Sequence, residues 1–210
     1  TALIPLIYIW IMSSKAASSG FVKPMPLSDA EYGGLNKWLF FALLLLVPSA
    51  VGIIIDPVTA LMPMPDALKA VFENLYLGTP LWDTLLATSV MAPLFEEFLC
   101  RGVILRGMLE NKEKPWKAIF WSSFIFAFIH LNPWQGVAAF SLALFFGWIY
   151  YRTRNLWACI FLHFVNNFTS IILARIFPDM DVDAALCETV PTMQFVILFI
   201  AAVLVLTAII

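Results

Sequence analysis

Long apolar runs separated by short polar segments dominate the chain. A helix needs about 20 mostly apolar residues to cross a bilayer, and repeated runs of this kind are typical of a multi-span membrane protein. The pattern predicts an all-α, polytopic transmembrane helix bundle of about seven spans, built as a single domain over residues 1–210. The first run is short and the last stops in apolar sequence, which is consistent with trimming at either end. The runs cover residues 3–12, 38–55, 84–109, 116–131, 134–151, 156–177 and 193–210.

The segments between these runs alternate in charge, and this alternation predicts an orientation. Basic residues gather in segments 13–37, 106–117 and 152–154, which the positive-inside rule places in the cytoplasm. The opposite segments are acidic, with Lys69 and Arg175 as their basic residues. Apolar residues between positions 66 and 77 repeat at helical spacing, which fits a short interfacial helix or, equally well, a packed turn.

Composition narrows the class of protein further. Apolar residues make up 62% of the chain and charged residues 12%, about half the charge density of a soluble domain. The net charge of −2 leaves no basic patch for nucleic acid, so the lipid bilayer is the partner that composition predicts. The three cysteines show no metal-ligand spacing and two lie in apolar runs, which argues against a disulfide framework or a zinc cluster. No protein partner can be identified.

A few polar residues lie inside the predicted spans, where each ionisable side chain costs a few kcal/mol and is a functional candidate. Structural roles compete with function, because a glutamate–arginine pair can clamp two helices and a buried histidine or asparagine can join them. The polar residues within the spans are Glu96, Glu97, Arg101, His130, His163, Asn166 and Asn167.

The spacing of these residues predicts how they are arranged. Glu97 and Arg101 are four apart on one helix face, where an ion pair lets both charges stay buried. Glu96 lies about 100° round the helix from Glu97, so it must face something else. At about 1.5 Å per residue, Glu96, His130 and Asn167 fall at the same depth, which predicts one polar layer inside the bundle.

Such a layer has the groups needed to hydrolyse an amide. A carboxylate beside a histidine can hold and deprotonate water, and a second histidine with an asparagine amide can stabilise an oxyanion. The catalytic motifs of other intramembrane proteases fit poorly. The chain has no HExxH pair, no aspartate within any span and no Gly-x-Ser-x-Gly elbow. Pro93 removes one helix hydrogen bond and can open the third span near the site. Zinc stays open as an alternative, held by Glu96, His130 and His163.

Three motifs carry a resemblance to a known family. Residues 96–101 resemble its EExxxR motif, residues 126–130 its FxxxH motif and residues 163–167 its HxxxN motif, in the family's order. The family is the CAAX protease and bacteriocin-processing (CPBP, or Abi) family, and the resemblance covers about 81–169. It implies an intramembrane endopeptidase fold with a polar active-site cavity. Cys100 departs from the family pattern; it could line the cavity, but a small buried hydrophobe is favoured.

The resemblance also implies roles for individual residues. Glu96 would activate a water with help from His130, and His163 with Asn167 would form the oxyanion hole. A glutamate-type mechanism without a cofactor is favoured over zinc, because no thiolate or fourth ligand is evident. The substrate would be a membrane-associated peptide or protein. The residues that would support the site are Glu97 and Arg101.

Two other classes of function remain open. A proton-coupled transporter could use the same buried cluster as a relay, although the sequence shows no repeated halves. A non-catalytic membrane scaffold could use the site as a binding pocket, although every motif residue is retained. Because most relatives of this size are prokaryotic, a bacterial inner membrane is the favoured location, and an endoplasmic reticulum protein would also fit.

Overall fold

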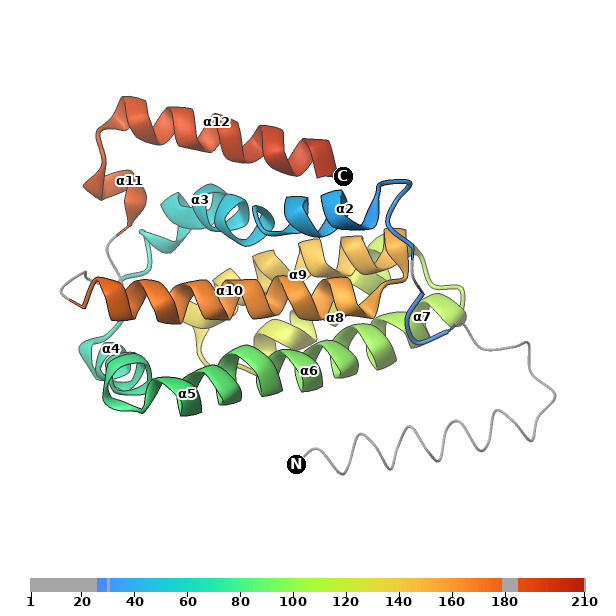
Figure 1. Ribbon diagram of the computed structural model, residues 1–210, viewed down its shortest axis with the longest axis horizontal. Helices are drawn as coiled ribbons and strands as arrows, with labels where there is room; N and C mark the ends of the chain where they lie inside the picture. Colours follow the sequence, from blue (N-terminus) through green and yellow to red (C-terminus); the bar gives the residue numbers. More distant parts are fainter. Residues whose placement is uncertain (1–25, 30, 179–184, 210) are drawn as a thin grey trace.

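The computed structural model describes residues 26–29, 31–178 and 185–209, and within these ranges the chain forms helices and no strand. The predicted all-α class is therefore confirmed. The long helices lie side by side with their axes roughly along one direction (Figure 1). In chain order, the elements are α2 (Lys37–Leu44), α3 (Val47–Thr59), α4 (Asp66–Glu73), η1 (Asn74–Gly78), α5 (Leu81–Thr84), η2 (Leu85–Met91), α6 (Ala92–Glu97), η3 (Phe98–Leu105), α7 (Arg106–Glu110), α8 (Pro115–Phe128), α9 (Pro133–Thr153), α10 (Leu156–Ile176), α11 (Leu186–Thr189) and α12 (Thr192–Ile209).

The predicted spans within the described residues all fall on helices, but not all of these helices qualify as spans by themselves. In the described ranges, Lys37–Thr59 and Leu156–Ile176 are long and apolar enough to cross a membrane, and Thr192–Thr207 is a shorter apolar helix. Helix α8 has 14 residues, and the helical stretch 81–110 carries several charges. The first predicted span, 3–12, lies outside the described residues. The count of seven spans therefore stays a prediction.

The two ends of the bundle differ in charge in the way the sequence alternation requires. Figure 1 places α4 and α11 at one end, and α7 with the start of α2 at the other. The basic segment 106–117 belongs to the end with α7, whereas the acidic residues of α4 belong to the opposite end. A helix does form within 66–77, although its place at a membrane surface stays a prediction, as does the side that faces the cytoplasm.

The stretch from α5 to α7 runs as one helix whose hydrogen-bond pattern changes along its length (Figure 1). Segments η2 and η3 have the wider π pattern, which is rare and often occurs near functional sites. Pro93 is the second residue of α6 and lies two positions after the last residue of η2. It has no N–H to donate, so its predicted loss of a helix hydrogen bond falls where the pattern changes.

The apolar core lies between α3, α8, α9, α10 and α12. Small residues let α8 and α9 approach closely: a Cβ added at Gly147 would lie 3.0 Å from Cγ2 of Ile119. Asn155 caps α10, because its side chain accepts a hydrogen bond from the backbone N–H of Ala158 at 3.1 Å. This cap and the close packing hold the beginning of α10 in place, and the polar residues follow farther along the same helix.

Candidate active site

The buried ion pair that the sequence predicts is present at the α6–η3 junction. Glu97 and Arg101 are both 0% exposed, and Nη1 of Arg101 lies 3.1 and 3.0 Å from the two carboxylate oxygens of Glu97. Nη2 of Arg101 donates to the carbonyl of Ala143 on α9 at 2.8 Å. The guanidinium also lies over the rings of Phe126 and Phe146, 4.8 and 5.4 Å from their centroids. Arg101 therefore links η3 to α8 and α9 as well as to Glu97.

His163 on α10 completes this cluster. Its Nδ1 lies 3.0 Å from Oε1 of Glu97, and its Nε2 lies 3.9 Å from Oε2 of Glu96. An ionised carboxylate can only accept, so Nδ1 of His163 carries the proton in this contact. Nε2 then carries a second proton only when the ring is an imidazolium. The contact between Glu97 and His163 is a feature that sequence spacing did not predict.

The two adjacent glutamates have different environments. Glu97 is fully buried and bonded to both Arg101 and His163. The side chain of Glu96 is 28% exposed, and its buried Oε2 has no hydrogen-bond partner among the described residues. This agrees with the prediction that the two carboxylates face different directions, and it leaves Glu96 as the carboxylate that is available to a ligand or a water.

His130 lies in the turn that follows α8, where a backbone carbonyl of α8 holds its ring. Its Nδ1 is 2.9 Å from the carbonyl oxygen of Phe126, which can only accept, so Nδ1 is the donor. In the neutral ring, Nε2 is then an acceptor. The ring of Phe126 lies between the two histidines, with centroids 5.2 Å from His130 and 5.4 Å from His163. Phe126 therefore packs against both histidine rings and also belongs to a buried apolar cluster.

Asn167 is held by a backbone carbonyl of η2 that has no partner within its own helix. Its Nδ2 donates to the carbonyl of Thr88 at 2.8 Å. Pro93, five residues after Thr88, cannot supply the π-type donor, and the N–H of Ala92 bonds to the carbonyl of Ala87. Freed backbone groups in membrane helices are often satisfied by a neighbouring helix in this way. Asn166 adds a hydrogen bond from its Nδ2 to Oδ1 of Asn167 at 3.0 Å.

These groups border a small cavity of about 100 Å³, enough for a few water molecules. Its polar wall contains His130, His163, Asn166 and Asn167, and Phe126 and Phe146 contribute apolar surface. Glu96 is not among the lining residues, although it lies beside His163. The structure thus brings His130, His163 and Asn167 to one cavity with Glu96 next to it.

Three of these side chains, Glu96, His130 and His163, are the zinc ligands that the sequence leaves open. In the described part of the chain, no group of three His, Cys, Asp or Glu side chains is placed to hold a metal ion. The zinc site considered from sequence, Glu96 with His130 and His163, stays a prediction that a chelator experiment tests. Cys100 is fully buried and does not line this cavity, which confirms its interpretation as a small buried hydrophobe.

Sequence reasoning missed the groups that hold the site from neighbouring helices. The carbonyls of Thr88 and Ala143 are backbone atoms, which every residue type possesses, so no sequence signal marks them. Phe146 lies in a uniformly apolar stretch of α9 and carries no distinguishing pattern. Gln135, which also lines the cavity, is a polar residue five positions after His130 and could have been noted for that reason.

The fold and the cluster define an all-helical protein with a buried carboxylate–histidine–asparagine site. Residues 78–169 match the family model described as "Type II CAAX prenyl endopeptidase Rce1-like", which confirms over this stretch the resemblance carried by the three motifs. The chain is also 28% identical over 94 residues to "Putative membrane peptidase YdiL" of Bacillus subtilis (strain 168). That match covers 45% of this chain and 38% of the relative. No solved structure matches the chain. The family match and the apolar helices together indicate a membrane protein.

Proposed function

We propose that the protein is an intramembrane endopeptidase that hydrolyses a peptide bond of a membrane-associated peptide or protein. The observation that carries the proposal is that residues from the three motif segments lie next to one another in the structure. Glu97 bonds to His163 across two helices with Glu96 beside it, and His130, His163 and Asn167 line one cavity. The peptidase family match over residues 78–169 supports the same class of reaction.

In the proposed reaction, Glu96 is the general base. It takes a proton from a water whose oxygen attacks the carbonyl carbon of the scissile bond, and it later returns that proton to the leaving amine as the C–N bond breaks. Nε2 of His130 is an acceptor in the neutral ring, because Nδ1 donates to Phe126, so it can orient the same water. A partly exposed carboxylate without a hydrogen-bond partner suits this task.

The oxyanion formed by the attack requires donors. One N–H of Asn167 is bonded to Thr88, and the second N–H of the same amide is available for the oxyanion. His163 can donate through Nε2 only as an imidazolium, because its Nδ1 proton is committed to Glu97. Glu97 and Arg101 support the site by fixing the ring orientation of His163.

The remaining parts of the proposal concern location and cofactors. The apolar runs give about seven spans, and the charge alternation orients the basic segments 13–37, 106–117 and 152–154 toward the cytoplasm. A bacterial inner membrane is the favoured location because most relatives of this size are prokaryotic. No cofactor is required by a mechanism in which a carboxylate and a histidine activate water.

A cleavage assay tests this proposal. Purified protein in detergent is given a mixed library of membrane-anchored peptides, and wild type is compared with Glu96→Gln, each with and without a metal chelator. We expect Glu96→Gln to lower the cleavage rate by about 10²- to 10⁴-fold, the usual contribution of a general base. Glu113→Gln is a matched control, because the Glu113 side chain is 39% exposed and pairs with exposed Lys117 outside the site.

Three outcomes would contradict the proposal in part or in whole. Equal cleavage by wild type and Glu96→Gln would remove Glu96 from the mechanism. Loss of cleavage in chelator and its recovery with zinc would replace the glutamate-type mechanism with a metal-dependent one. A folded wild-type protein that cleaves no peptide in the library would contradict the endopeptidase function.

A further inference from the structure

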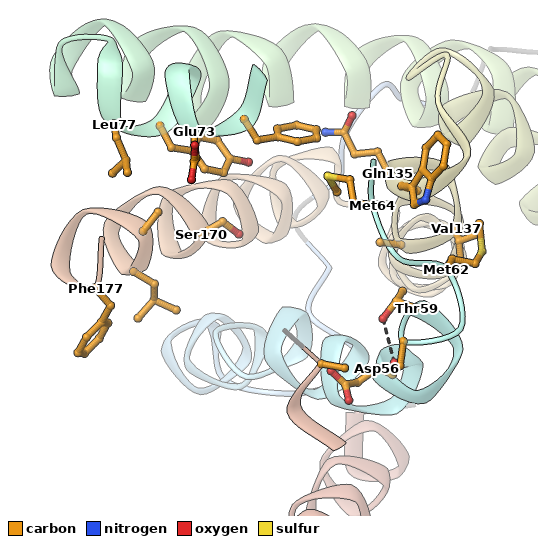
Figure 2. A pocket seen from close by; sticks show the side chains of 18 of the residues that line it. Asp56, Thr59, Met62, Met64, Glu73, Leu77, Gln135, Val137, Ser170 and Phe177 are labelled. Atoms are coloured by element: carbon orange, nitrogen blue, oxygen red, sulfur yellow. Dashed lines mark hydrogen bonds between the residues drawn. The ribbon is translucent and has the colours of Figure 1, made fainter. Parts of the chain in front are cut away.

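A larger cavity of about 450 Å³ lies at the end of the bundle that carries α4 and α11. Figure 2 shows it between the end of α3, the α4–η1 segment, the start of α9 and the second half of α10. Its volume lies within the roughly 300–1,000 Å³ typical of ligand sites, whereas the polar cavity has about 100 Å³. The reaction proposed above needs space for a polypeptide, and the polar cavity alone does not provide it.

The two cavities adjoin. Gln135 and Ala138, one turn apart on α9, line both of them. Ala138 has only a methyl group, so no long side chain projects from this position between the two spaces. A segment held in the larger cavity would therefore extend past these two residues toward His130 and His163.

Gln135 offers hydrogen-bond donors at this junction, and its orientation follows from its neighbours. Oδ1 of Asn132 accepts the backbone N–H of Gln135 at 2.8 Å, so Nδ2 of Asn132 is the donor to the side chain of Gln135. That second contact, 2.9 Å long, must be made by Oε1 of Gln135, because only its oxygen accepts. The Nε2 group of Gln135 is then left to donate elsewhere, and Figure 2 shows the side chain among those that line the cavity.

The charge of the larger cavity is negative. Asp56 and Glu73 line it, and no basic side chain does so among the described residues. Both carboxylate oxygens of Asp56 accept backbone N–H groups of α11, at 2.8 and 2.7 Å, whereas Glu73 is exposed on α4. Burial raises the pKa of Tyr76, so its phenol stays neutral near pH 7 and adds no charge. Glu73 is thus the acidic group that can pair with a ligand.

Most of the remaining wall is apolar and adaptable. Met62 and Met64 come from the segment after α3, and methionine side chains adjust their shape to different partners. Phe72, Trp134 and Phe177 add aromatic surface. A wall of this kind accepts varied apolar side chains, so selectivity must come from the few polar groups.

We propose that this cavity binds the substrate polypeptide beside its scissile bond, selecting an apolar segment that carries a basic side chain. Glu73 pairs with the basic side chain, and Nε2 of Gln135 donates to a backbone carbonyl of the substrate as the chain enters the polar cavity. This inference rests on the proposed endopeptidase function and names the class of substrate for it. A segment with an acidic side chain at the same position is disfavoured by Asp56 and Glu73 together.

Peptide binding tests the inference separately from cleavage. The probes are short fluorescent apolar peptides with one central lysine, and the same peptides with glutamate in its place. Binding to the full chain in detergent is measured by fluorescence anisotropy in the Glu96→Gln background, which keeps the active-site base out of the measurement. We expect the lysine peptide to bind about two- to fivefold more tightly, the range that exposed ion pairs give.

Variants locate the binding. Glu73→Lys should reverse the preference between the two peptides, whereas Asp83→Lys, at an exposed acidic residue outside the cavity wall, should leave it unchanged. Gln135→Leu should weaken both peptides by a similar factor. Ala138→Phe should weaken both by about tenfold by filling the junction, provided that circular dichroism shows an unchanged fold.

The outcomes separate this inference from the proposed function. Equal binding of both peptides with no effect of Glu73→Lys would overturn the inference, even if Glu96-dependent cleavage is observed. Unchanged binding to a folded Ala138→Phe variant would also overturn it. Charge-selective binding that follows these variants, without cleavage by the wild type, would support the binding site and contradict the endopeptidase function.

Discussion

The two halves of α10 show how one helix can be both a packed support and an open site. Its first two turns bury Leu156, Ala158, Cys159 and Leu162 in the apolar core. From His163 onward the helix presents polar residues to the two cavities. Burying polar groups is costly unless they are hydrogen-bonded, and here the bonds come from other helices. The comparison indicates that the first half determines where α10 lies. Partners in η2 and α6 determine what its second half can do.

The largest effect is expected from breaking the buried ion pair that holds the second half. Arg101→Met leaves Glu97 as an uncompensated buried charge beside His163, which costs about 3–5 kcal/mol of stability. Unfolding in mixed detergent micelles measures this change. The double variant Glu97→Leu with Arg101→Met should recover much of the loss, because apolar replacements of both partners are often tolerated. A single variant that unfolds like the wild type would mean that the pair does not hold the site.

A smaller effect is expected when one donor is removed from the polar half. Asn167→Ala should lower the cleavage rate by about 10²-fold, the usual cost of losing an oxyanion donor, with the fold retained. Asn166→Ala is a suitable control, since Asn166 bonds to Asn167 but is not itself an assigned donor. Equal losses in the two variants would show that Asn167 acts through packing rather than through the oxyanion.

The smallest effect on cleavage is expected at Pro93. Pro93 acts on α10 through the Thr88 carbonyl, which it leaves available to Asn167. Pro93→Ala supplies a backbone N–H that can compete with Asn167 for the Thr88 carbonyl, so cleavage should fall by up to about tenfold. Stability should rise at the same time, because proline within a helix is unfavourable by about 3 kcal/mol. Pro57→Ala, within α3 and outside the three motifs, should raise stability without lowering cleavage. Higher activity in Pro93→Ala would contradict this role.

The sequence was sufficient for the features that depend on spacing along one helix. The pair Glu97 and Arg101, four residues apart, forms as predicted, and the two glutamates face different directions for the reason given by helix geometry. Partners across helices could not be predicted, because the carbonyls that hold Arg101 and Asn167 have no sequence signature. The π pattern before Pro93 could not be predicted either, because a few wider turns do not change the repeat of apolar and polar positions along the chain.

The adjacent carboxylates Glu96 and Glu97 offer the most direct test of the account, because the same isosteric change can be made at each. Cleavage rate and unfolding in detergent are measured together for Glu96→Gln and Glu97→Gln. The account predicts that Glu96→Gln keeps wild-type stability and loses cleavage, whereas Glu97→Gln loses stability because Arg101 and His163 lose a charged partner. Retained cleavage in Glu96→Gln, or a stability loss as large as that of Glu97→Gln, would contradict the assignment of Glu96 as the base.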